Sequence, residues 1–235
     1  MAPGPEPDGA GAARRRAVVV AGHTGDEAVA RAALDDPSPG ARGSALSALA
    51  RMGCLEVEDI FRALADRSGE VRRRACELAG RMGTTSVGVG TASLGDQLVT
   101  ALVDVSPSVV EAACYALGEL GAGAQRTGVV AALSSVATGH RDPLCREAAV
   151  AALGSLGQAA GLAAVLSALE DKSAVRRRAV IALAGFDDSF EDDGVQGALR
   201  KALSDPDWQV RQGAEDVLGQ RTRPGGGRPG PARPA

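Results

Sequence analysis

A short block recurs along the chain, and this internal repetition limits the fold more than any other feature of the sequence. Residues 71–83 and 145–157 align without a gap. Further blocks begin at residues 13, 41, 109, 175 and 210, so that successive starts lie 28 to 38 residues apart. An interval of this length suits one pair of helices. We therefore expect a stack of similar helical hairpins.

Each block predicts a helix with one buried face. Alanine occupies the fifth position of every block, and the eighth position is always Ala, Val or Leu. With the first position, these residues form the i, i+4, i+7 stripe of a helix that buries one side. A small residue on that stripe lets a neighbouring helix approach closely. The fifth-position residues are Ala17, Ala45, Ala75, Ala113, Ala149, Ala179 and Ala214.

A partner helix is expected before most blocks. Apolar segments that end in Ala-Leu precede five of them, and a short turn with an aspartate and often a proline leads into the block. Proline is tolerated there because the N–H groups of a first helical turn have no intrahelical acceptor. Glycine ends many of the blocks, since it can adopt the left-handed conformation that stops a helix. These glycines are Gly25, Gly53, Gly83, Gly121 and Gly157.

The turn and the block together resemble HEAT repeats, in particular the short phycobilisome-lyase-like subtype. An Asp-x(5)-Arg spacing precedes a V-R-x-x-A-x-x-A-L pattern, and the similarity covers nearly the whole chain between the tails. The resemblance implies an all-α superhelix, a HEAT or armadillo-like solenoid of about six hairpins plus an N-terminal half repeat. The spacing occurs at Asp36 and Arg42, Asp66 and Arg72, and Asp205 and Arg211.

Three repeats depart from this pattern. Val110 replaces the arginine in one repeat, His140 stands where the next repeat should have its aspartate, and Asp171 is one residue out of register. We expect these repeats to pack differently from the others.

Composition argues against several classes of protein. Only 2% of residues are aromatic while 45% are apolar, so the core must be built from Ala, Leu and Val, which favours closely packed helices. The formal net charge of -3 gives no overall attraction for nucleic acid. The four cysteines and two histidines lack the spacing of a metal or redox site, so we expect no metal and no cofactor. Tyr115 and Trp208 are expected to be packing residues.

Three regions are expected along the chain. Residues 1–12 and 221–235 are rich in Pro and Gly and predict disordered tails, and residues 13–220 form the solenoid. Residues 84–94 are interpreted as a flexible insertion between repeats. Residues 148–169 carry no charge, but three glycines interrupt them, so two buried helices are expected in place of a membrane span.

Arginine recurs at the second block position, and the resemblance implies that it forms a ladder of ion pairs with the turn aspartates. Further arginines follow it in three blocks. There the helix dipole disfavours cations, whereas free backbone N–H groups and guanidinium groups together would suit an anion or a partner. A solvated face is the simpler interpretation. The candidate residues are Arg15, Arg16, Arg73, Arg74, Arg177 and Arg178.

The sequence favours a non-catalytic, cytoplasmic scaffold that binds another protein through the surface of the solenoid. Nucleic-acid binding, in the manner of HEAT-like alkylpurine DNA glycosylases, is an alternative that would require the extra arginines to converge on one groove. A bilin lyase or isomerase, which the subtype invites, is a second alternative. No enzymatic activity and no membrane contact are expected.

Overall fold

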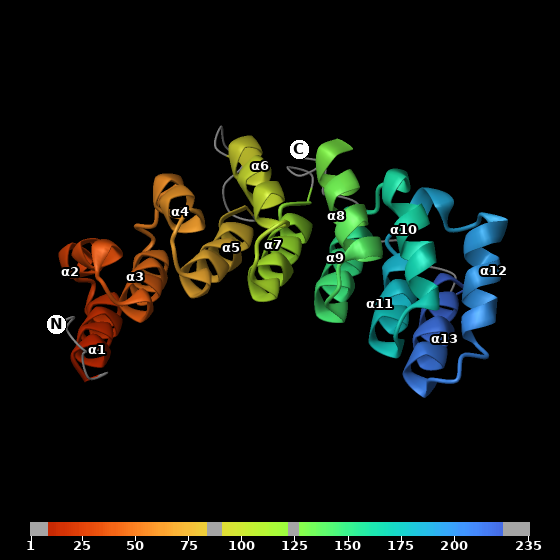
Figure 1. Cartoon of the computed structure of the whole chain (residues 1–235). Coiled ribbons are helices and arrows are strands. Elements are labelled where there is room, and N and C mark those ends of the chain that lie inside the picture. The colour runs from red at the N-terminus through yellow and green to blue at the C-terminus, as the bar shows by residue number, and fades with distance from the viewer. Residues whose placement is uncertain (1–8, 84–90, 122–126, 223–235) are drawn as a thin grey trace, which may run out of the picture.

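The computed structural model describes residues 9–83, 91–121 and 127–222, and those ranges contain helices and short turns but no strand. The α-helices follow one another along the chain (Figure 1). Their bounds are α1 (Gly9–Thr24), α2 (Glu27–Ala32), α3 (Pro39–Met52), α4 (Val57–Leu64), α5 (Gly69–Gly83), α6 (Thr91–Ala101), α7 (Pro107–Glu119), α8 (Thr127–Gly139), α9 (Pro143–Leu156), α10 (Leu162–Ser167), α11 (Ser173–Leu183), α12 (Asp193–Ala202) and α13 (Trp208–Thr222).

The helices form two layers. Helix α1 has no helical partner before it within the described residues, and the others pair in order into hairpins from α2–α3 to α12–α13. The odd-numbered helices form one row and the even-numbered helices the other, and the molecule arches so that the odd-numbered row lies on its underside (Figure 1). We call these rows the inner and the outer layer. The predicted superhelix of six hairpins plus a half repeat is confirmed.

The predicted alanine stripe is buried in every hairpin. Ala45, Ala75, Ala113, Ala149 and Ala179 all have no exposed side-chain surface. Such complete burial depends on the stack and not on one hairpin, because a single hairpin cannot cover its own apolar stripe. Larger side chains such as Leu117 and Leu153 fill the remaining space between the layers.

Helix α1 does not follow the predicted stripe. Ala17 is exposed and Val20 is 58% exposed, whereas the following residues on the other side, Val18 and Ala21, are buried. The eighth block position faces the tenth position of the preceding repeat, and α1 has no preceding helix in the described part of the chain. The prediction that every block buries this stripe is therefore wrong for the first one.

Glycines at the tenth block position bring the inner helices close together. A Cβ atom on Gly154 would lie 2.7 Å from the Cα atom of Ala182, and one on Gly80 would lie 3.0 Å from the Cα atom of Ala116. The inner helices thus pack backbone against backbone. Because the inner row is packed so closely, the stack bends toward it.

The boundaries differ in places from those expected. Helix α1 begins at Gly9, within the segment predicted as a tail, and α13 continues to Thr222. Helix α6 begins at Thr91, so the last residues of the expected insertion are helical, and Leu94 is buried. The rest of that insertion and the outer parts of both tails lie outside the described residues.

The long uncharged segment forms two separate helices as predicted. Helix α9 ends at Leu156 and is capped by Gly157, whose φ of 61° is left-handed, and α10 follows after a short 3-10 turn. Gly25, Gly53 and Gly121 also have positive φ, whereas Gly83 is the last residue of α5. No helix in the described ranges has both the length and the apolar character needed to span a bilayer.

Candidate functional site

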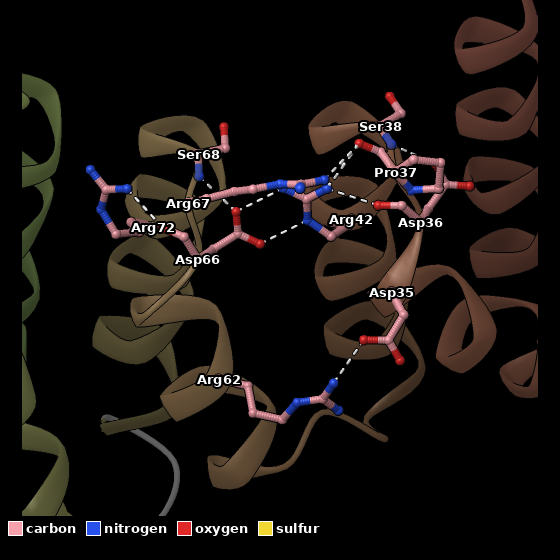
Figure 2. Close-up of polar contacts among 10 residues, drawn as sticks. All are labelled: Asp35, Asp36, Pro37, Ser38, Arg42, Arg62, Asp66, Arg67, Ser68 and Arg72. Atoms are coloured by element: carbon pink, nitrogen blue, oxygen red, sulfur yellow. Dashed lines mark hydrogen bonds and ion pairs between the residues drawn. The ribbon is translucent and has the colours of Figure 1, made fainter.

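The second-position arginines form ion pairs between successive repeats. Figure 2 shows one of these pairs, in which Arg42 of α3 binds Asp66 of the next turn. The distances are 2.7 Å from Nε to Oδ2 and 2.8 Å from Nη2 to Oδ1. We call this series of contacts the ladder. Its members are Arg14 with Asp36, Arg42 with Asp66, Arg72 with Asp104, Arg146 with Asp171, and Arg176 with Asp205.

We call each ion pair of the ladder a rung. A rung with two hydrogen bonds also holds the turns on both sides of it. Arg42 Nη1 donates to the backbone oxygen of Asp36, 2.8 Å away, in the turn that precedes its own helix. The carboxylate of Asp66 accepts from the backbone N–H of Ser68 at 2.7 Å. One guanidinium and one carboxylate therefore join two repeats, which suits the planar, two-pronged geometry of this pair.

The ladder shifts the pKa values of its own residues. Hydrogen bonds from Arg72 hold the pKa of Asp104 below its usual range, and bonds to Asp104 raise the pKa of Arg72. The same cause lowers the pKa of Asp171 and of Asp205. Since these carboxylates are bound to arginine, their shifts report structural ion pairs and not catalytic groups.

One rung is replaced at both of its ends. Val110 of α7 is fully buried where other inner helices carry arginine, and His140 stands at the aspartate position of the next turn. The His140 ring still closes its turn, because Nδ1 accepts from the backbone N–H of Asp142 at 3.1 Å. The backbone oxygen of His140 accepts from Arg146 at 2.7 Å, as the aspartate oxygens do elsewhere. The predicted departure of these repeats thus amounts to the loss of one ion pair.

Asp171 keeps its rung in spite of its shifted register. Its carboxylate binds Arg146 at 2.6 and 2.7 Å and accepts from the backbone N–H of Lys172, the next residue, where other turns use the residue after that. The expectation that this repeat packs differently is wrong for the ion pair. The turn is one residue shorter after the aspartate, and this change compensates for the shifted position of Asp171.

A shallow hollow of about 340 Å³ lies between the first two hairpins. Arg62 and Asp35 form a mostly exposed ion pair of 2.8 Å beside it, and Arg42 with Asp66 forms its opposite wall (Figure 2). A similar hollow near the C-terminus carries the equivalent pair, Lys201 with Glu170, at 2.7 Å. Because the hollow recurs with the repeat and ion pairs flank it, we assign it to inter-repeat packing.

The surface of the odd-numbered helices that is turned away from the outer layer is the inner face. A groove of about 520 Å³ runs along it between α7 and α9, and every residue that lines this groove belongs to α7, α9 or α11. Tyr115 and Leu144 contribute apolar surface and are 55% and 56% exposed. The acidic residues Glu111, Glu119 and Glu147 also line it.

A second groove on the same face has the opposite charge. It lies across α1, α3 and α5 and is lined by Arg15, Arg51, Arg73 and Arg74, with Glu70 as its acidic residue. Arg51 and Arg74 also line the adjoining hollow toward the C-terminal ends of α3 and α5. The inner face is therefore basic over α3 and α5 and acidic over α7 and α9.

The comparisons with known proteins agree with this architecture. The profile of the family described as HEAT repeats matches residues 95–184 and 162–226, which together span more than half of the chain. The chain belongs to the HEAT repeat family. No curated protein shows significant sequence similarity to it.

Several solved structures share the fold of these HEAT repeats. An engineered protein is 18% identical with a TM-score of 0.63, over 83% of this chain and 95% of that one. A chain from the CpcE–CpcF complex of phycocyanin lyase from Nostoc sp. PCC7120 is 22% identical with a TM-score of 0.58, over 83% and 76%. A computationally designed armadillo repeat protein for modular peptide recognition is 20% identical with a TM-score of 0.52, over 74% and 85%.

The six candidate arginines do not form one site on the HEAT repeats. Arg15, Arg73 and Arg74 line the basic groove, whereas Arg178 lines the acidic groove, where it binds Glu147 at 3.3 Å. Arg74 binds Glu77 at 2.8 Å, and Arg73 binds the same carboxylate. Arg16 and Arg177 line neither groove.

Sequence reasoning missed the acidic half of the inner face. The expectation that Tyr115 and Trp208 are packing residues is wrong, because their side chains are 55% and 65% exposed. Tyr115 occupies the seventh block position, together with Ser47, Glu77 and Ala151 of other repeats. A comparison of the third, seventh and eleventh positions between blocks would have shown that the charge changes sign along one face.

Proposed function

We propose that the chain is a non-catalytic scaffold that binds a segment of another protein on its inner face. The observation that carries this proposal is the groove between α7 and α9, where the exposed side chains of Tyr115 and Leu144 lie among acidic residues. Aromatic side chains that are exposed in a concave surface are typical of protein contacts. The designed armadillo protein for peptide recognition has the same type of fold, which supports the proposal by analogy.

The chemistry of the titratable groups also supports a binding role. The aspartates with lowered pKa values belong to the ladder, where they hold repeats together. Burial raises the pKa of Cys76 to about 12, so its thiol stays protonated and inert. All four cysteines are free, which supports a reducing compartment such as the cytoplasm.

Nucleic acid fits the inner face less well than protein does. The basic groove across α1, α3 and α5 adjoins an acidic one, and three glutamates there would repel a phosphate backbone that continued along the face. Only part of the candidate arginine set lines the basic groove. The alternative function would require all of it on one surface.

Selection of peptides from a random phage-displayed library on the full chain tests the proposal. Selected peptides should bind the parent chain in solution and should lose at least tenfold in affinity on the Ala151→Arg variant, which places a long side chain in the groove. Ala131→Arg is the matched control, because Ala131 is exposed on α8 in the outer layer of the same hairpin. Failure to select any peptide, or equal losses in the two variants, would overturn the proposal.

A further inference from the structure

The charge on the inner face changes sign between α5 and α7. Arg51 lies at the same block position, eleven, as Glu119, and Arg73 lies at the same position, three, as Glu111. Toward the N-terminus most of the charged groove residues are arginine, and toward the C-terminus most of them are glutamate. The ladder does not use these side chains.

Several of these charges are available to a partner. Among the residues that the structure describes, Arg51, Glu111 and Glu119 are exposed and form no ion pair. By contrast, Arg74 is paired with Glu77 and Arg178 with Glu147. A bound segment of complementary charge could reach the unpaired groups without first breaking an ion pair within the chain.

The exposed apolar side chains lie in the acidic groove. Tyr115 and Leu144 line the groove between α7 and α9 together with Glu111 and Glu119. Apolar contact there would add affinity that exposed ion pairs alone do not supply, because each exposed pair contributes little. The positions of the basic and acidic halves then determine which half binds the acidic part of a partner and which half binds its basic part.

From this arrangement we infer that the inner face binds an extended segment whose two ends carry opposite charges. Its acidic end lies over α3 and α5 near Arg51 and Arg74, and its basic end lies over α7 and α9 near Glu111 and Glu119. This inference rests on the proposed function and names the chemistry of the partner. Packed helices lie about 8–10 Å apart, so the midpoint between α3 and α5 lies about 16–20 Å from the midpoint between α7 and α9. An extended chain advances about 3.3 Å per residue, so about five or six residues separate the two charged ends.

A pair of fluorescein-labelled peptides tests the inference by anisotropy at low salt. The first is Glu-Asp-Glu-Ser-Leu-Ser-Leu-Ser-Arg-Lys-Arg, and the second has the same residues with acidic and basic side chains alternating. The first peptide should bind the full chain about fivefold more tightly or better. A peptide with the reversed sequence is not a useful control, because an extended segment can bind the inner face in either chain direction.

Charge reversal of each half provides the second part of the test. Arg51→Glu with Arg74→Glu removes most of the positive charge of the basic half, where Arg15 and Arg73 remain, and Glu111→Arg with Glu119→Arg removes most of the negative charge of the acidic half. Each double variant should bind the first peptide about fivefold more weakly. The variant with all four substitutions reverses the balance of charge between the two halves and should regain most of the affinity, because the peptide can bind in the opposite direction. Circular dichroism checks that each variant is folded.

The possible outcomes separate the inference from the proposed function. Equal binding of the two peptides, binding by neither, or no recovery in the fourfold variant would overturn the charge assignment. If library-selected peptides still required an open groove at Ala151, the proposed function would stand. Sedimentation of the chain alone tests whether the inner face binds a second copy of the chain. If the parent is a dimer and either double variant is a monomer, the face is a dimer interface, and this result would also overturn the inference.

Discussion

Arg72 and Asp104 join two repeats through a pair of hydrogen bonds, 2.7 Å from Nε to Oδ2 and 2.9 Å from Nη2 to Oδ1. Their side chains are only 16% and 12% exposed. The variant Asp104→Asn would leave a poorly solvated guanidinium without its anionic partner. We expect the free energy of unfolding to fall by about 1–3 kcal/mol, as measured by urea denaturation.

Asp35→Asn is the matched control for this substitution. Asp35 also binds an arginine, Arg62, but these side chains are 76% and 65% exposed, so water can replace the lost contact. This variant should be close to the parent in stability. Equal effects of the two substitutions would show that the ladder contributes no more than any surface ion pair.

The missing rung can be restored by changing both of its ends. Val110→Arg alone should destabilise the chain by about 3 kcal/mol or more, because it buries a charge at a site with no exposed surface. Adding His140→Asp should recover part of that loss, because the carboxylate would pair with the new arginine. A double-mutant cycle should give a favourable coupling of about 1 kcal/mol or more. A coupling near zero would mean that this junction cannot form a rung.

Gly154 tests the close approach of the inner helices. Replacing glycine by alanine within a helix normally stabilises it by up to about 1 kcal/mol. At Gly154 the new methyl group would lie 2.7 Å from the Cα atom of Ala182, so we expect a loss of about 1–3 kcal/mol. Gly197→Ala in α12 is the control, since no atom lies within 4 Å of its Cβ position. Thermal unfolding should shift in opposite directions for the two variants.

The repeat predicted the fold well because helices buried in a stack need small or apolar residues at the same positions of every repeat. Ala75 and Ala149 could be placed in the core from their spacing alone. The same logic failed at Ala17, because its burial depends on a preceding helix that is not present in the described residues. The function of Gly154 was also missed, since a contact between two backbones is not visible in the hydrophobic pattern.

The candidate site was harder to predict than the fold. The candidate arginines could be recognised because they recur at the same block positions, and the ladder role of Arg42 was implied by the resemblance to HEAT repeats. The sequence alone does not distinguish Glu111 and Glu119 from other surface residues, because each is an ordinary charge on an exposed helix face. Their importance depends on which neighbouring helices bring them to one groove, and one block considered alone does not contain that information.

Acid should weaken the ladder. The pKa of Asp104 lies below its unfolded value of about 3.9 because Arg72 donates hydrogen bonds to the carboxylate. A lowered pKa in the folded state means that this stabilisation is complete above the unfolded pKa and is lost as the pH falls through the folded pKa. Urea denaturation between neutral pH and pH of about 2.5 should therefore show the parent and Asp104→Asn converging in stability as the solution becomes acidic. A constant difference across this range would contradict the ion-pair account.

The most direct test of the account is to map where a selected peptide lies on the chain. A library-selected peptide carrying a photoreactive leucine analogue can be cross-linked to the full protein, and the linked residues can be identified by mass spectrometry. The account predicts links to the inner face of α5, α7 and α9, including residues beside Tyr115 and Leu144. Links confined to the outer helices, such as α6 and α8, would contradict it.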